Sequence, residues 1–199
     1  MADRQLSELM AFLRHGLLHS PVASDWADVA PGVPIVVSTH THDPAEHSFN
    51  ERDLPGLFGF RGDSRTEYAD DLARVKSEIM VYWIPPPAVQ DVLRARAPIF
   101  YQVGNTVLKL LQEDVFGDYL DGGSFSEQAE FSVARLSRWR TRTLSIEMTE
   151  TGPTTQRKYR YLEMTIDTES EERRDTEQYL EPSYLCTGGG MTLEVRPTQ

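Results

Sequence analysis

The sequence predicts an α/β (α+β) fold: a single mixed, mainly antiparallel sheet with two packing helices, a long interaction loop and a C-terminal arm. Both alternating faces of residues 72–84 are apolar, as in a central strand that is covered on both sides. Prolines at 85–87 end that strand, because proline cannot donate to a ladder. Apolar residues then recur at helical spacing up to Gln112, which predicts a helix lying back across the sheet.

The length and composition favour one domain. A chain of 199 residues with 39% hydrophobic content can bury one good core. We assign residues 1–168 to a single α/β domain with a long loop at 39–71, and residues 169–199 to an extended arm. The two helices are expected to cover the two faces of the strand at 72–84.

The N-terminal segment predicts a helix followed by a loop and a short strand. Asp3 is a suitable N-cap, and the apolar stripe after it ends before Pro21. The stripe consists of Leu6, Leu9, Met10, Leu13 and Leu17. The segment 21–34 contains helix-hostile prolines and is expected to be a loop, and the apolar run at 35–37 predicts a short buried strand.

The predicted loop at 39–71 has little periodicity. Loops of that length inside a compact domain usually serve function or interaction. This one contains large apolar side chains that a solvated loop would not keep, so we expect it to dock on a partner. These side chains are Phe49, Leu57, Phe58 and Phe60.

The later part of the chain predicts a hairpin with one wet face. Apolar and polar residues alternate over 144–148 and again over 162–166, on either side of a turn signal at 151–153. Residues 124–139 fit a strand or a helix face, and the strand is favoured. Tyr159 and Tyr161 are out of phase with residues 162–166, which suggests a bulge near Tyr161.

The charge and cysteine content exclude some classes of function. A net charge of −11 argues against gripping nucleic acid, because phosphate binding needs clustered Lys and Arg. The single Cys186 excludes an internal disulfide and a multi-thiolate metal site. No apolar run is long enough to span a membrane, and no signal peptide is evident, so we expect the protein to stay in the cytoplasm in which it is made or to leave it by lysis.

The histidines directly after the predicted strand at 35–37 permit two interpretations. His40 and His42 on alternate residues resemble the start of amidohydrolase-like metal enzymes for about eight residues. In that alternative, a small metal-dependent hydrolase, His47 completes the ligand set and Asp43 or Glu46 is the base. Further distal ligands are missing, so a polar interface loop is favoured, and no catalytic residue, metal or cofactor is assigned.

A basic cluster and the C-terminal arm are the other candidate contact sites. Four arginines surround Trp139, and in so acidic a chain they favour an intersubunit ion-pairing strip that includes Arg138 and Arg140. In the arm, Tyr179, Tyr184 and Leu185 are the apolar side chains expected to contact a neighbour.

The order of elements resembles that of a viral protein family. A first helix, a Pro-rich entry to a strand, a long loop, the sequence SEIMVYWIPPP at 77–87, a helix ending VLKLLQ at 107–112 and a late hairpin follow one another. This order resembles the tail terminator (tail completion) and head-tail joining proteins of tailed bacteriophages.

The resemblance implies a structural virion protein without enzymatic activity. It implies a hexameric ring that ends the tail tube and offers the head a docking surface, with DNA passing through the channel without specific binding. The implied partners are further copies of the chain, tail tube and sheath proteins, and the head-completion or connector protein. The implied location is the virion tail or neck, after assembly in the host cytoplasm. A bacterial protein of a phage-derived contractile machine would assemble through the same kinds of contact, so the sequence does not separate it from a virion protein.

Overall fold

The computed structural model of the chain describes residues 4–47, 49–69, 72–95, 98–113, 133–148, 155–173, 182–187 and 190–195. Its elements are α1 (Arg4–Leu18), α2 (Pro21–Val29), β1 (Ser38–His40), the 3-10 turn η1 (Glu51–Asp53), β2 (Gly56–Ala69), β3 (Leu72–Ile84), the 3-10 turn η2 (Pro87–Val89), α3 (Gln90–Ala95), α4 (Pro98–Glu113), β4 (Val133–Met148), β5 (Thr155–Arg173), β6 (Pro182–Thr187) and β7 (Gly190–Val195). None of the described helices is long and apolar enough to cross a membrane.

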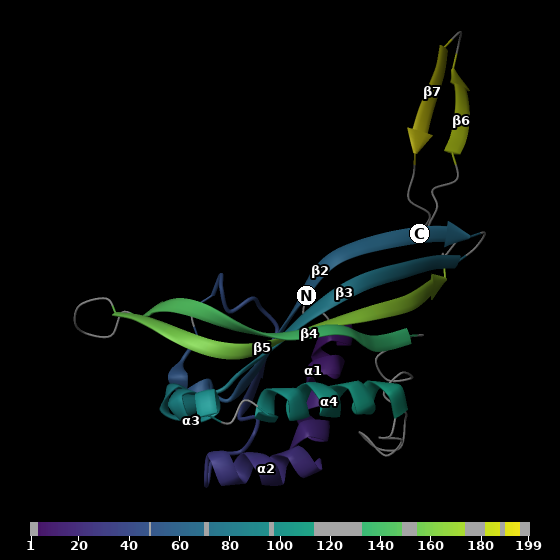
Figure 1. The fold of residues 1–199 in the computed structure, drawn as a ribbon. Coiled ribbons are helices and arrows are strands. Elements are labelled where there is room, and N and C mark those ends of the chain that lie inside the picture. The colour runs from purple at the N-terminus through teal and green to yellow at the C-terminus, as the bar shows by residue number, and fades with distance from the viewer. Residues whose placement is uncertain are drawn as a thin grey trace.

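A single mixed sheet carries the fold, as predicted. Its strands lie in the order β1-β2-β3-β5-β4, with β1 and β2 parallel and the other pairs antiparallel. The strand at 72–84 is the central strand β3, and pairing stops at Ile84, where the prolines begin. The α-helices lie together on one side of the sheet (Figure 1).

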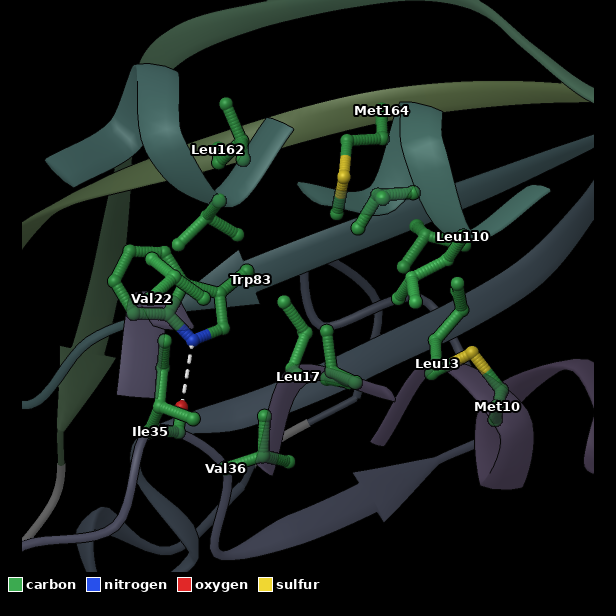
Figure 2. Close-up of a cluster of buried hydrophobic side chains, with 14 of the residues drawn as sticks. Met10, Leu13, Leu17, Val22, Ile35, Val36, Trp83, Leu110, Leu162 and Met164 are labelled. Atoms are coloured by element: carbon green, nitrogen blue, oxygen red, sulfur yellow. Dashed lines mark hydrogen bonds between the residues drawn. The ribbon is translucent and has the colours of Figure 1, made fainter. Parts of the chain in front are cut away.

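The main core lies between the sheet and these helices. Ile79, Val81 and Trp83 of β3 alternate toward the helices and are fully buried. Figure 2 shows side chains of α1 and α4 meeting those of β3 and β5 in this layer. The Trp83 indole N–H donates a hydrogen bond of 2.9 Å to the Ile35 carbonyl, which ties the segment before β1 to the core.

The expectation that the two helices cover opposite faces of the sheet is wrong. Leu57, Leu162 and Met164 point to the same face as Trp83, and this continuous apolar layer needs both α1 and α4 to cover it. We call the opposite face, which carries Phe60, Met80, Tyr82, Tyr161 and Glu163, the open face.

The segment 21–34 contains a helix where a loop was predicted. Pro21 occupies the first turn of α2, where a missing backbone N–H costs no helical hydrogen bond. Trp26 of α2 is fully buried and meets the edge of Trp83 at 5.4 Å between ring centroids. The hydrogen-bonded strand β1 starts at Ser38, although Ile35 and Val36 before it are buried as predicted.

The predicted loop at 39–71 contains the strand β2, so the loop prediction is wrong for residues 56–69. After Phe60 the strand carries polar and charged residues, and it pairs with β3 as far as Ala69 and Leu72. Apolar periodicity cannot predict a strand that is stabilised by backbone hydrogen bonds to its neighbour and by ion pairs. The arm boundary at 169 is wrong for the same reason, because β5 continues to Arg173 in register with β3.

The predicted late hairpin is confirmed as β4 and β5. The strand interpretation holds from Val133, while residues 124–132 and the turn at 151–153 lie outside the described residues. The bulge predicted near Tyr161 is absent from the continuous register there; the irregularity lies in β4 between Leu136 and Arg138. Tyr159 and Tyr161 lie on the open face, where the second apolar cluster buries them. That face is therefore not solvent-exposed along its whole length.

The described part of the C-terminal arm forms a second, two-stranded sheet. β6 and β7 pair antiparallel from Pro182 with Val195 to Thr187 with Gly190. Figure 1 shows this hairpin standing away from the five-stranded sheet.

The close approach of α4 to β4 depends on Gly104. A Cβ at this position would lie 2.8 Å from Cδ2 of the Trp139 indole, a rigid ring that cannot bend away. We expect Gly104→Ala to lower the free energy of unfolding by about 1 kcal/mol, because overpacking of about 1–3 kcal/mol exceeds the gain in helix propensity of about 1 kcal/mol.

Urea unfolding checks this prediction in two backgrounds. In a Trp139→Leu chain the ring is gone, so the same Gly104→Ala change should become neutral or stabilising. A loss of stability that is equal in both backgrounds would contradict the role of the Gly104–Trp139 contact.

Candidate functional site

The open face combines aromatic, methionine and arginine side chains on four neighbouring strands. The register places Phe60 of β2 beside Met80 of β3, and Glu163 of β5 between Tyr82 of β3 and Arg140 of β4. Phe60, Met80 and Tyr82 are only partly buried. We call these three side chains the open-face patch. The segment 49–54 contributes to a second apolar cluster at the end of this face near Ile84.

Glu163 is a buried carboxylate held by two arginines. Its side chain is 4% exposed, whereas those of Arg140 and Arg142 are 43% and 45% exposed. Arg140 donates from Nε to Glu163 Oε1 at 2.7 Å, and Arg142 Nε lies 2.9 Å from Oε2. A buried charge is tolerated only when it is paired in this way, so the two guanidinium groups fix the polar part of the open face.

Arg138 begins this row of arginines directly after the irregularity in β4. It is exposed and lies opposite Thr165. Within the described part of the chain it has no ion-pair partner, while Arg135 lies 3.9 Å from Asp167. The predicted Arg strip is therefore one continuous row. Arg140 pairs with the chain's own Glu163, and contact of Arg138 with a partner stays a prediction.

Tyr82 of the open-face patch packs against Tyr161, and both tyrosines stay protonated at neutral pH. The rings of Tyr82 and Tyr161 are 4.8 Å apart, and Phe60 meets Tyr82 edge to face at 5.2 Å. Burial raises the pKa of Tyr82 well above its ordinary value of 10.0, with smaller effects from Tyr161 and Glu163. Burial also raises the pKa of Tyr161. Of the two, the partly buried Tyr82 offers apolar area with a hydrogen-bonding tip, which is typical of contact surfaces, whereas Tyr161 is buried beneath the face.

A charged depression of about 710 Å³ continues the open face toward the β2–β3 turn. Among its lining residues five are acidic and three are basic, which does not suit a phosphate ligand. Ion pairs join the strands around it: Lys76 with Glu67 at 2.9 Å and Arg74 with Glu171 at 3.0 Å. The lining residues are Asp63, Ser64, Arg65, Glu67, Lys76, Ser77, Glu78, Arg135, Asp167, Thr168 and Glu169.

The apolar residues predicted to dock on a partner differ in how deeply the structure buries them. The prediction is wrong for Leu57 and Phe58, which are fully buried because the main core and the second cluster need them. Phe49 packs partly against Phe58 at 5.0 Å between ring centroids. Phe60 belongs to the open-face patch, so its role in an interface stays a prediction.

The arm residues chosen from the sequence are only partly described. Tyr184 and Leu185 lie in β6, where they pair in register with Leu193 and Thr192 of β7. Tyr179 lies outside the described residues. Their contact with a neighbour stays a prediction.

His40 and His42 pack against Phe58 and His47 packs against His42, but the three histidines do not form a ligand set. His40 stacks on Phe58 at 4.7 Å, and His42 lies 5.3 Å from both His40 and His47 between ring centroids. His40 Nε2 is 2.8 Å from Ser38 Oγ. No group of three or more His, Cys, Asp or Glu side chains in the described ranges is placed to hold a metal ion. That this segment is a polar interface loop stays a prediction.

His42 should make the stability of the protein depend on pH. Its Nε2 is buried without a hydrogen-bond partner, and burial lowers the pKa of His42 below the ordinary 6.5, with smaller effects from His40 and His47. Burial and His19 lower the pKa of His15 in the same way. Below 6.5 the unfolded chain then binds more protons than the folded one, so stability should fall as the pH drops through the folded-state values.

Thermal unfolding between about pH 8 and pH 5 measures this dependence. The variant His42→Phe keeps an aromatic ring against Phe58 and removes the titrating group, so its midpoint should vary less with pH than that of the wild type. His15 should preserve part of the dependence. Parallel curves for variant and wild type would contradict the assignment to His42.

The residues that sequence reasoning missed are Met80, Tyr82, Tyr161 and Glu163. In the sequence, Glu163 is one of several polar residues that alternate with apolar ones, so it was expected to lie on a solvent-exposed strand face. The spacing of Arg140 and Arg142 could have indicated this acid. Two arginines that are two residues apart lie on the same face of a strand, and an acidic residue on the neighbouring strand would stabilise them. That acid could be identified only once the register was known.

No family model matches this chain, and no curated protein is similar enough in sequence to count as a relative.

Proposed function

We propose that the chain is a structural virion protein of a tailed bacteriophage, a subunit of the ring that ends the tail tube and joins the tail to the head or neck. The observation that carries the proposal is the open-face patch beside the arginine row. Aromatic, Met and Arg side chains are enriched where proteins contact proteins, and partly exposed Phe60, Met80 and Tyr82 share the open face of the sheet with Arg138, one strand away from Met80.

The order of elements supports the viral assignment. The first helix, the central strand ending in prolines, the helix after it and the late hairpin occur in the order that resembles tail terminator and head-tail joining proteins.

The charge of the chain supports passage of DNA without specific binding. With a net charge of −11 per subunit, a ring of about six copies would repel phosphate at short range. The expected partners are other copies of the chain, tail tube and sheath proteins, and the head-completion or connector protein. The expected location is the tail or neck of the particle.

Removal of the gene from the genome that encodes this chain tests the proposed function. Electron microscopy of the lysate should show heads and tails that fail to join, or tubes of uncontrolled length. Complementation should restore joined particles that contain the chain, detectable by mass spectrometry of purified particles. Complete, infectious particles without the chain would contradict the proposal, and so would complementation by a protein that never joins the particle.

A further inference from the structure

We propose that His15 and His19, at the C-terminal end of α1, form a binding site for one divalent transition-metal ion such as Zn²⁺, Cu²⁺ or Ni²⁺. We call these two side chains the α1 histidine pair. Imidazole nitrogen is a ligand that all three ions accept. The site goes beyond the proposed function, which does not require it, so the two proposals are tested separately.

Helical spacing brings the two imidazole rings together. His15 lies in the last turn of α1, and the backbone N–H of His19, just after the helix, still donates to the His15 carbonyl at 3.2 Å. Residues four positions apart are neighbours on a helix surface, and here the ring centroids are 4.2 Å apart. Two histidines at this spacing on a helix are also the pair that binds zinc in metalloproteases.

The distance between the rings fits a shared ion. Zinc lies about 2.0–2.1 Å from a ligating imidazole nitrogen, so two rings bound to one ion have centroids roughly 4–5 Å apart. The observed separation of 4.2 Å lies within that range. Binding therefore requires adjustment of two side chains and no change in the path of the helix.

A hydrogen bond to the backbone sets the tautomer of His19. Its Nδ1 lies 2.8 Å from the His15 carbonyl oxygen. A carbonyl oxygen only accepts, so Nδ1 carries the proton and Nε2 carries the lone pair that an ion needs. Histidines that bind metals usually donate their other ring N–H to a carbonyl or carboxylate in this way. His19 is exposed, so an ion from solvent can reach it.

The environment of His15 favours the neutral ring that a metal ion requires. Burial lowers the pKa of His15 below the ordinary 6.5, and His19 lowers it further, so protons compete little with the ion at neutral pH. No third His, Cys, Asp or Glu side chain in the described part of the chain is placed to join the pair, so water completes the coordination. We expect a dissociation constant on the order of 1–100 µM, weaker than that of a four-ligand zinc site.

The histidines near Phe58 are the competing site in this chain. His40, His42 and His47 do not lie on a helix, and His42 is 5.3 Å from each of the other two between ring centroids. The Nε2 of His42 is buried, which keeps it from an ion in solvent. The α1 histidine pair is therefore the better site.

Calorimetric titration of the full chain, without an affinity tag, with ZnCl₂ at about pH 7.5 tests the inference. The wild type should bind one ion. His15→Gln and His19→Gln should each weaken binding by roughly tenfold or more, because one helix no longer supplies both ligands to the same ion. His19 is exposed, so His19→Gln should retain the fold, which circular dichroism verifies.

Two matched controls separate the spacing from the number of histidines. The double variant Arg14→His, His15→Gln keeps five histidines in the chain but moves one ligand off the helix face, so it should bind as weakly as His15→Gln. His47→Gln removes an exposed histidine from the competing site and should bind like the wild type. Zinc should also raise the unfolding midpoint of the wild type and of His47→Gln, and not that of His19→Gln.

Three outcomes would overturn the inference. The first is a wild type that binds no zinc below about 1 mM, which is an adventitious ion only. The second is full binding by His15→Gln or by the double variant, because the helical pair would then not be the site. The third is loss of binding in His47→Gln with binding retained in His19→Gln, which would assign the ion to the histidines near Phe58. None of these results bears on whether the chain joins heads to tails.

Discussion

Replacing Trp83 by Ala is expected to lower the free energy of unfolding by about 3–5 kcal/mol, the largest effect of any single core change considered for this chain. Trp83 is fully buried in the central strand, where its ring meets Trp26 at 5.4 Å and Phe100 at 5.6 Å between centroids. Its truncation would leave a cavity between α2, α4 and the sheet. It would also leave the Ile35 carbonyl, which accepts from the indole at 2.9 Å, without that donor.

Urea unfolding of Trp83→Ala and Trp83→Phe separates these two contributions. Trp83→Phe keeps most of the apolar contact and loses the indole donor, so it should cost about 1–3 kcal/mol, clearly less than Trp83→Ala. The slope of the unfolding free energy with urea should stay the same for both. Equal losses for the two variants would show that packing of the ring is not what stabilises this region.

The central strand explains how much of the fold the sequence can predict. Apolar alternation and prolines are local signals, and they located β3, its end at Ile84, and the helices α1 and α4. The charged part of β2 and the end of β5 are held by ladders with β3 and by pairs such as Arg74 with Glu171. Such pairs join residues nearly a hundred positions apart, so no local pattern reveals them.

The open face was harder to predict because its character depends on register. Phe60 looked like a loop residue and Glu163 like a solvated one. They share a face only because β2, β3 and β5 pair as they do. The arginine row was visible in the sequence, since it lies on one strand. Whether each arginine serves the chain itself or a partner depends on which acid lies opposite, as Arg140 and Arg138 demonstrate.

The second large effect is expected when the buried Glu163 loses both of its arginines. The double variant Arg140→Gln, Arg142→Gln should lose about 3–5 kcal/mol of stability, because it leaves a carboxylate that is 4% exposed without its two cations. Glu163→Gln alone should cost about 1–3 kcal/mol, since the two guanidinium groups are nearly half exposed and stay hydrated.

The triple variant provides the decisive comparison. Adding Glu163→Gln to the double variant removes the uncompensated charge, so it should restore much of the lost stability, a non-additivity that denaturant unfolding measures directly. Arg138→Gln is the matched control: it lies on the same strand and face without an ion-pair partner in the described part of the chain, and should change stability by no more than about 0.5 kcal/mol. A triple variant no more stable than the double would show that the arginines stabilise the open face by packing their stems on it rather than by neutralising Glu163.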